Sequence, residues 1–329
     1  MGERLAQLQS WLTKEAGLPE FEIEPASGDA SFRRYFRLSF EGETRIAMDA
    51  PPERENSRPF IEVGEQLFEL GLNVPEILHH DLEQGFMLLG DLGNRQYLDE
   101  LNEQTVDRYY GDALGALLTI QACGPDGESL PHYDRELLLA EMNLFRDWYL
   151  TRHLEHQLSE SEQAVLDQSF ELLAESALEQ PQVTVHRDYH SRNLMVTEVH
   201  NPGILDFQDA VYGPVTYDLV SLLRDCYIEW PRERVEGWVR GYHDLALDSG
   251  ILREPCESRF MRWFDLMGVQ RHLKAAGIFA RLNHRDGRPG YLKDIPRTVG
   301  YIYEVSGRDS ELAPLHTLLE SLVMEQLTK

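Results

Sequence analysis

Three polar side chains stand in an order that suits phosphoryl transfer. Asp188 directly follows His186-Arg187, Asn193 comes five positions later, and Asp206 closes a short apolar run. Metal-assisted phosphoryl transfer needs one carboxylate facing the incoming hydroxyl, and an amide oxygen and a second carboxylate that hold Mg²⁺ against the phosphates of a nucleotide. This order predicts Asp188 as the catalytic residue and Asn193 and Asp206 as metal ligands, with ATP and Mg²⁺ as cofactors.

The segments around these residues support the assignment. Residues 183–185 are typical of a short strand entering a loop, 194–196 of a strand leaving it, and 203–205 of the strand that carries Asp206. Such a hairpin places Asn193 and Asp206 at neighbouring strand ends. The spacing H-R-D-x-x-x-x-N is also the catalytic-loop pattern of protein kinases. The alternative is a chance HRD in a surface loop, which four matching positions and a second acid on a flanking strand disfavour.

Composition limits the class of protein. The chain has 329 residues, of which 42% are hydrophobic, so it can bury a sizeable core. Its net charge of −26 argues against nucleic-acid binding, and it suits either a cationic small substrate or simple solubility. No run approaches a membrane span, the amphipathic N-terminus lacks a signal-peptide core, and three scattered cysteines fit a reducing compartment. We therefore expect a cytoplasmic protein with a small-molecule substrate and no obligate protein partner.

The N-terminal part alternates strand-like runs with polar turns. Strands are expected at 21–25, 32–40, 44–48, 76–79 and 85–89, and a helix at 57–70 that ends before a glycine. The turn after the first strand would cover nucleotide phosphates with backbone N–H groups. We assign this contact to Ser27, Gly28, Asp29 and Ser31. An ordinary hairpin would have the same sequence features.

A glycine-containing connection follows the last of these strands. Backbone groups there could bind an adenine edge, so we expect Leu89, Asp91 and Leu92 to contact the nucleotide, although a plain linker has the same composition. Helical patterns then begin near 105, 134, 159, 215, 231, 255 and 309. Strands first and helices later predict an α+β, protein-kinase-like fold of two lobes. These are a small antiparallel-sheet lobe with one helix over residues 1–90 and a larger, mainly helical lobe over 91–329.

The motifs resemble those of the aminoglycoside phosphotransferase and choline kinase-like enzymes, which share the protein-kinase fold. The resemblance covers nearly the whole chain and is most specific in HRDYHSRNLMV and ILDFQDAVYGPVTYDL. The segments GDASFRRY, MDAPP and DFQDA are more similar still to bacterial kinases that phosphorylate the C1 hydroxyl of N-acetylmuramate and N-acetylglucosamine in cell-wall recycling. The resemblance implies a sugar 1-phosphate product and ATP as donor.

One departure from the kinase pattern concerns charge. Most kinases end the third strand with a lysine that contacts the α- and β-phosphates, whereas this chain has Met48-Asp49 there. Another cation must then neutralise the phosphates, and Arg33, Arg34 or a second metal are the alternatives; we assign Arg33 to the nucleotide site. The same departure leaves open a non-catalytic nucleotide-binding protein, against which the intact Asp188, Asn193 and Asp206 argue.

Acceptor recognition is predicted from position. Gln208 and Asp209 neighbour the metal aspartate, and Arg224 or Arg271 would supply a guanidinium for a muramate carboxylate. For either arginine the alternative is a surface or interhelical salt bridge. Asp218, His186 and Arg187 are predicted to hold the catalytic loop in shape. An aminoglycoside- or choline-type kinase would use the same catalytic residues with acidic and aromatic groups around a cationic acceptor.

Overall fold

The computed structural model describes residues 2–27 and 32–327, and the side chains as far as residue 322. The chain forms two compact units. The first comprises residues 1–116 with 192–209, and the second comprises 117–191 with 210–329. Helix α4 (Val106–Cys123) carries the chain from the first unit into the second. None of the helices in the described ranges is long and apolar enough to cross a membrane.

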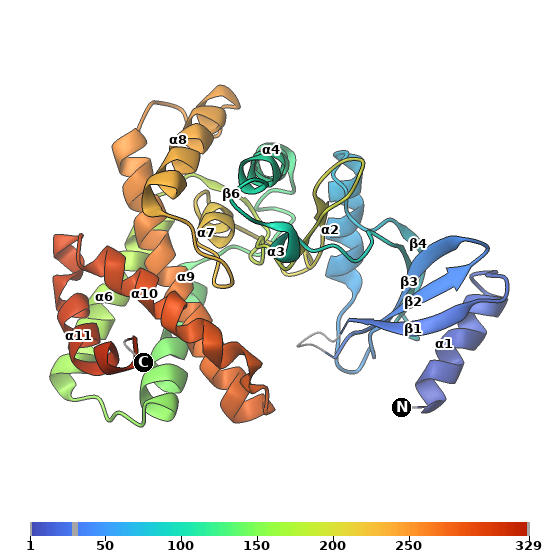
Figure 1. Cartoon of the computed structure of the whole chain (residues 1–329), viewed down its shortest axis with the longest axis horizontal. Coiled ribbons are helices and arrows are strands. Elements are labelled where there is room, and N and C mark those ends of the chain that lie inside the picture. Colours follow the sequence, from blue (N-terminus) through green and yellow to red (C-terminus); the bar gives the residue numbers. More distant parts are fainter. Residues whose placement is uncertain (1, 28–31, 328–329) are drawn as a thin grey trace. The chain divides into compact units, whose positions relative to one another are not determined.

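The first unit is built on a five-stranded antiparallel sheet of order β1-β2-β3-β5-β4. Its strands are β1 (Glu22–Ser27), β2 (Arg34–Phe40), β3 (Glu43–Asp49), β4 (Ile77–Asp81) and β5 (Phe86–Gly90). Helix α1 (Gly2–Lys14) packs on this sheet in Figure 1, and its Leu8, Trp11 and Leu12 share a core with Leu38, Ala47, Phe86 and Leu88. The apolar stripe of the amphipathic N-terminus therefore completes the sheet's core.

The rest of the first unit consists of helices and a short hairpin from later in the chain. Helix α2 (Arg58–Glu69) follows the third strand, and α3 (Tyr97–Glu100) precedes α4. The short strands β7 (Leu194–Met195) and β8 (Gly203–Ile204) pair antiparallel. Bridges from residue 73 to 203 and from 96 to 195 tie this hairpin to the N-terminal segments. Because of these contacts, the first unit extends beyond residue 90 and includes residues 192–209. The predicted division at residue 90, into a nucleotide-covering lobe and an acceptor-binding lobe, stays a prediction.

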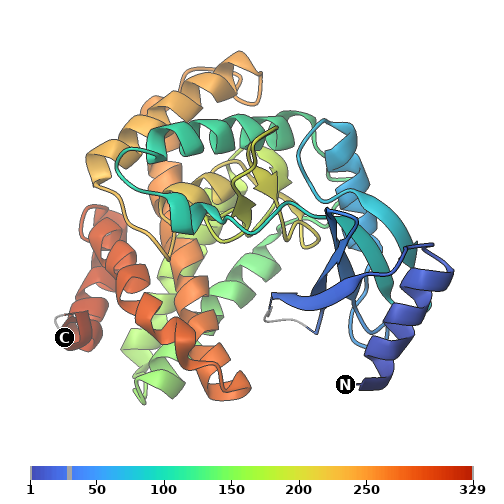
Figure 2. The same cartoon turned by 45° about the vertical axis from the view of Figure 1, so that its right-hand side comes forward.

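The second unit is mainly helical and centres on the long helix α9 (Glu257–Asp286), against which α5 (Arg135–Leu144), α6 (Glu160–Leu178) and α10 (Ile295–Ser306) pack (Figure 2). Strands β6 (Gln182–Val185) and β9 (Val211–Pro214) form a two-stranded antiparallel sheet. The remaining elements are the π-helix η1 (Phe145–His153), α7 (Tyr217–Leu223), α8 (Arg232–Asp248), η2 (Pro289–Asp294), η3 (Ser310–Leu312) and α11 (Ala313–Leu327).

Local signals explain several helix starts. Asp134 accepts a hydrogen bond from Leu137 N at 2.9 Å, and Ser159 with Glu162 forms a reciprocal capping box, as the sequence predicts. Two expectations were wrong. Phe32 lies before the start of β2 and is 56% exposed, and its ring lies beside the Arg54 guanidinium. Helix α10 was not expected, because Pro296 and Gly300 interrupt its pattern, yet Pro296 stands in the first turn, where proline is tolerated.

Candidate active site

The catalytic loop begins in the second unit, directly after β6. The buried carboxylate of Asp218, at the start of α7, accepts hydrogen bonds from His186 N at 2.6 Å and Arg187 N at 3.0 Å. The structural role predicted for Asp218 is confirmed by these two bonds. Burial raises the pKa of Asp218 to about 7, against the opposing effect of the two backbone N–H groups. Arg187 has a φ of +78°, so the loop turns sharply just before Asp188.

A buried network of charged and tyrosine side chains holds Arg187 of the loop. Arg187 and Tyr133 both hydrogen-bond to Glu141, and Lys274 Nζ lies 3.1 Å from Glu141 Oε1 and 2.9 Å from the Tyr217 hydroxyl. Burial raises the pKa of Glu141, but the charges of Lys274 and Arg187 and the hydrogen bonds from Tyr133 and Lys274 together lower it by more, so this carboxylate is ionised. The network joins α5 and α9 to the catalytic loop.

Asp188 is partly exposed and surrounded by positive charge. Its backbone N–H donates to His186 Nδ1 at 3.3 Å. Desolvation raises the pKa of Asp188, but Lys274, then His190 and Arg271, lower it by more, so the net shift is downward. A carboxylate that stays ionised at neutral pH can accept a hydrogen bond from an incoming hydroxyl.

The end of the loop is held by a carboxylate that the sequence did not identify as an anchor. Asp225 accepts hydrogen bonds from Ser191 N at 2.9 Å and Ser191 Oγ at 2.5 Å, and from Tyr227 N at 2.9 Å. Both Ser191 and Asp225 are buried. An aspartate seven residues after Asp218 was visible in the sequence, but its partner could not be found from spacing.

Asn193 and Asp206 belong to the first unit, at the ends of the β7–β8 hairpin. Leu205 N donates to Asn193 O at 2.9 Å, and Asn193 Nδ2 lies 3.3 Å from Asp206 Oδ2. The predicted hairpin and the proximity of these two side chains are confirmed. Asp206 has a φ of +67°, and its other oxygen accepts a hydrogen bond from Gln208 Nε2 at 2.7 Å. Gln208, which was predicted to contact the acceptor, therefore donates its side-chain hydrogen bond to Asp206 in this structure.

This pair suits Mg²⁺. An amide oxygen and a carboxylate are hard oxygen donors, and Mg²⁺ is usually held by one or two such groups together with substrate phosphates and water. No group of three His, Cys, Asp or Glu side chains among the described residues could hold a metal by itself. The donor set of Asn193 and Asp206 thus fits an ion that is also bound by nucleotide phosphates.

The residues predicted to cover the nucleotide are partly described. Ser27 ends β1 opposite Tyr35, at an irregularity in the register. Gly28, Asp29 and Ser31 lie outside the described residues. Arg33 is buried, and its Nη2 lies 3.3 Å from Glu55 Oε2.

The strand that lacks a lysine carries a buried acid instead. Asp49 is fully buried at the end of β3 and pairs with Arg4 from α1 and Arg34 from β2; the two Nε···carboxylate distances are 3.0 and 3.1 Å. Met48 is buried in the same strand. Both arginines thus have a carboxylate partner, Arg34 in Asp49 and Arg33 in Glu55, so the group that neutralises the phosphates stays a prediction.

The segment 89–93 has defined contacts of its own. Leu89 is buried in β5, opposite Ile46. Asp91 pairs with Arg37 at 2.7 and 3.0 Å and accepts a hydrogen bond from Gly93 N at 2.9 Å. Burial raises the pKa of Asp91, but its bond to Arg37 contributes to a net lowering. The Asp91 side chain is thus held by Arg37 and by the backbone of the connection, and the nucleotide contact of Leu89, Asp91 and Leu92 stays a prediction.

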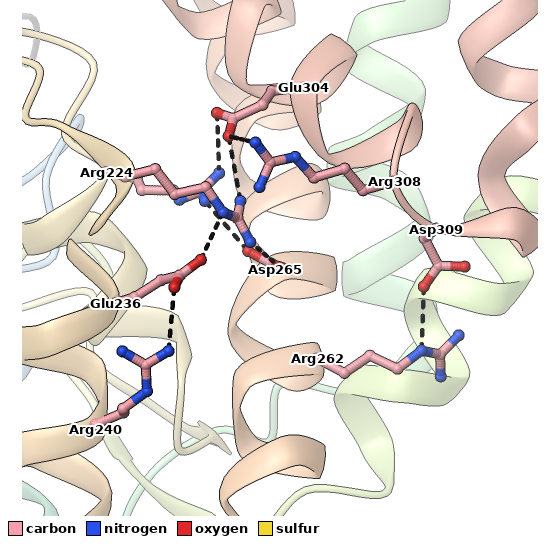
Figure 3. A network of polar contacts seen from close by, with 9 residues as sticks. Arg224, Glu236, Arg240, Arg262, Asp265, Glu304, Arg308 and Asp309 are labelled. Atoms are coloured by element: carbon pink, nitrogen blue, oxygen red, sulfur yellow. Dashed lines mark hydrogen bonds and ion pairs between the residues drawn. The ribbon is translucent and has the colours of Figure 1, made fainter. Parts of the chain in front are cut away.

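The remaining predicted acceptor residues occupy different environments in the sequence's second half. Asp209 is exposed. Arg271 is buried, lies 3.7 Å from Cys226 Sγ, and interacts with Asp188 through its charge. Arg224 is also buried, but it pairs with Asp265 at 3.2 Å, as the salt-bridge reading expected (Figure 3). The charge of Arg271 is among those that lower the pKa of Asp188.

Comparison with known proteins identifies the family to which the chain belongs. Residues 22–254 match the profile of the phosphotransferase enzyme family. The chain belongs to this family. It is 47% identical to the N-acetylmuramate/N-acetylglucosamine kinase of Pseudomonas putida, over 97% of this chain and 96% of that protein. It is 43% identical to the protein of the same name from Neisseria meningitidis, over 98% and 97% of the two chains.

Solved structures confirm the fold. The aminoglycoside phosphotransferase APH(2″)-Ib with ADP bound superimposes with a TM-score of 0.61 at 15% identity, covering 91% of this chain and 98% of that one. The choline kinase LicA of Streptococcus pneumoniae gives a TM-score of 0.64 at 13% identity, covering 92% and 100%. The two-lobe, protein-kinase-like α+β prediction is therefore confirmed.

Proposed function

We propose that this phosphotransferase uses ATP to phosphorylate the anomeric C1 hydroxyl of N-acetylmuramate and N-acetylglucosamine, in the cytoplasm, as a step of peptidoglycan recycling. The observation that carries the proposal is the 47% identity with kinases of that name over nearly the full length of both chains. The ionised Asp188 and the Asn193–Asp206 pair support the chemistry.

Each residue has a separate task. Asp188 accepts or orients the proton of the C1 hydroxyl; an anomeric hydroxyl is more acidic than an ordinary alcohol, so a carboxylate of low pKa acts mainly by positioning. Asn193 and Asp206 would hold Mg²⁺, which when bound neutralises charge on the nucleotide phosphates. Gln208 orients Asp206, and Ser27, Gly28, Asp29, Ser31 and Arg33 would cover the phosphates, as predicted from the sequence.

Arg271 is the better candidate for the lactyl carboxylate of N-acetylmuramate. Its guanidinium is buried near Asp188, whereas Arg224 is tied to Asp265. Asp209 is exposed and could contact the acceptor's polar groups. Replacing Arg271 by alanine would then reduce kcat/KM for N-acetylmuramate more than for N-acetylglucosamine.

The decisive experiment measures ATP consumption over a panel of acceptors. The panel contains both amino sugars, choline and an aminoglycoside, and the position of the new phosphate is determined by NMR. We expect sugar 1-phosphates from the two amino sugars. Turnover confined to choline or the aminoglycoside would replace the proposal with the alternative acceptor class, and ATP binding without turnover of any acceptor would indicate a non-catalytic protein.

The variant Asp188→Asn tests the role of the catalytic aspartate. The amide cannot take a proton, so kcat is expected to fall by about a hundredfold or more, while nucleotide affinity stays nearly unchanged. Asp248→Asn, which changes an exposed aspartate at the end of α8, serves as a control that should retain most of kcat. An Asp188→Asn enzyme with near wild-type kcat would remove Asp188 from this role.

A further inference from the structure

Two histidine side chains face each other in the second unit, apart from the site described above. His153 is the last residue of η1, and His284 lies in the last turn of α9. The His153 Nδ1 atom lies 3.3 Å from the His284 Nε2 atom, and the two ring planes make an angle of 67°. The fold thus brings together two ring nitrogens from segments 131 residues apart in the sequence.

The packing of η1 on α9 determines where these two rings meet. A Cβ atom at Gly277 of α9 would collide with the backbone of Leu144 and Phe145, so only glycine fits at this crossing. His284 comes seven residues after Gly277, and His153 comes eight residues after Phe145. The two helices therefore run in the same direction from the crossing and end beside each other.

Aromatic packing holds the His153 ring in a fixed orientation. η1 is a π-helix with i→i+5 hydrogen bonds, so side chains four or five positions apart lie over one another. Tyr149 packs against Phe145 with ring centroids 5.0 Å apart, and it stacks on His153 at 5.8 Å. Phe145 and Tyr149 are buried, whereas His153 is half-buried. The row of rings thus orients His153 at the surface before any ligand binds.

The separation of the two nitrogens is that of two ligands on one metal ion. Zn²⁺ binds imidazole nitrogen at about 2.0–2.1 Å in a tetrahedral arrangement, so two of its nitrogen ligands lie about 3.3–3.4 Å apart. His153 Nδ1 and His284 Nε2 meet this condition at 3.3 Å. A direct hydrogen bond between the rings is the alternative, and it would be longer than the usual range of about 2.7–3.2 Å.

The charge around the pair suits a cation that binds reversibly. Both helices end here, and a helix C-terminus carries a partial negative charge. Burial, and then His284, lower the pKa of His153, so its ring is neutral at pH 7 and can bind a metal. Arg285 pairs with Asp286, so their charges cancel, whereas the charge of Arg281, a turn before His284, opposes a cation.

We propose that His153 and His284 form a binding site for Zn²⁺, with water molecules as its other ligands. Imidazole nitrogen suits Zn²⁺, whereas Mg²⁺ prefers oxygen donors such as those of Asn193 and Asp206. No group of three His, Cys, Asp or Glu side chains in the described ranges could hold a metal, so this ion has two protein ligands and positions open to solvent. The site goes beyond the proposed function and does not depend on it.

The test measures Zn²⁺ binding to the full chain by isothermal titration calorimetry, with excess Mg²⁺ present to occupy the oxygen donors. We expect saturable binding of Zn²⁺. His153→Gln and His284→Gln each remove one ligand and should weaken this binding by at least about tenfold, because even the partners of metal ligands contribute that much to affinity. Binding should also weaken at mildly acidic pH, because protons compete with the metal for both rings.

His132→Gln is the matched control, because His132 is exposed and its ring also contacts a tyrosine, Tyr212, at a centroid distance of 5.8 Å. It should bind Zn²⁺ like the wild type. His284 is exposed, so His284→Gln decides the question even if His153→Gln disturbs the folding of η1. Three results would overturn the proposal: no saturable binding of Zn²⁺, a Kd that His284→Gln leaves unchanged, or an equal loss of affinity in His132→Gln.

Discussion

At the scale of single residues, the most informative side chain is Lys274. It is buried between Glu141 and Tyr217, and its charge is the largest of those that lower the pKa of Asp188. Lys274→Met removes that charge, so Asp188 should take up a proton at higher pH. We expect the acid limb of the kcat–pH profile to move to higher pH and kcat at neutral pH to fall.

Two further variants separate this electrostatic effect from a structural one. Lys274→Arg keeps the charge and should keep the limb near its wild-type position. Lys293→Met removes an exposed lysine and should leave the profile unchanged. If Lys274→Met lowers kcat without moving the limb, Lys274 only supports the packing around Glu141.

A second prediction at this scale concerns His272. Burial, and then the charge of Arg271, lower its pKa to about 3, and its Nε2 lies 2.8 Å from Arg224 O. The unfolded chain would bind a proton at His272 below its ordinary pKa of about 6.5, whereas the folded chain would not. Its contribution to stability is therefore complete above pH 6.5 and is lost progressively as the pH falls towards 3.

The measurement is urea denaturation at pH 7 and at mildly acidic pH. The free energy of unfolding of the wild type should fall on acidification with a slope of up to about 1.4 kcal/mol per pH unit from this one proton. His272→Gln should reduce the slope, and His132→Gln, which changes an exposed histidine, should not. Equal slopes in the wild type and His272→Gln would mean that His272 titrates alike in both states.

At the scale of elements, Asp49 joins helix α1 to strands β2 and β3. It is fully buried and holds Arg4 and Arg34 together. Asp49→Asn would leave both guanidiniums without a charged partner, and breaking a buried pair costs about 3–5 kcal/mol. Because both arginines are about one third exposed, we expect a loss near 2 kcal/mol in urea denaturation.

The exposed pair of Glu43 and Arg45 in the same strand provides the control. Glu43→Gln should cost less than about 1 kcal/mol. Similar losses in the two variants would show that the buried acid contributes no more than a surface charge.

Elements were predicted well where the pattern is local. The β7–β8 hairpin follows from two apolar runs around Asn193 and Asp206, and the capping box at Ser159 marks the start of α6. Partners distant in sequence could not be predicted: Arg4 is 45 residues from Asp49, and Lys274 lies on a helix far from Glu141. The sequence therefore identified the groups that could react, but not the charges that tune them.

At the scale of the whole molecule, ligand binding should be visible as stability. A ligand that binds only the folded chain at 100 times its Kd stabilises that state by about 2.7 kcal/mol. We expect ATP with Mg²⁺ to raise the melting temperature more than ATP with EDTA. With Mg²⁺ present, Asn193 and Asp206 would bind an ion that the phosphates of ATP bind as well. Asp206→Asn should remove the Mg²⁺-dependent part of the shift, whereas Asp209→Asn, three residues further along the chain, should retain it. A Mg²⁺-dependent shift that survives in Asp206→Asn would place the metal on other ligands and leave Asp206 with its hydrogen bonds to Gln208 and Asn193.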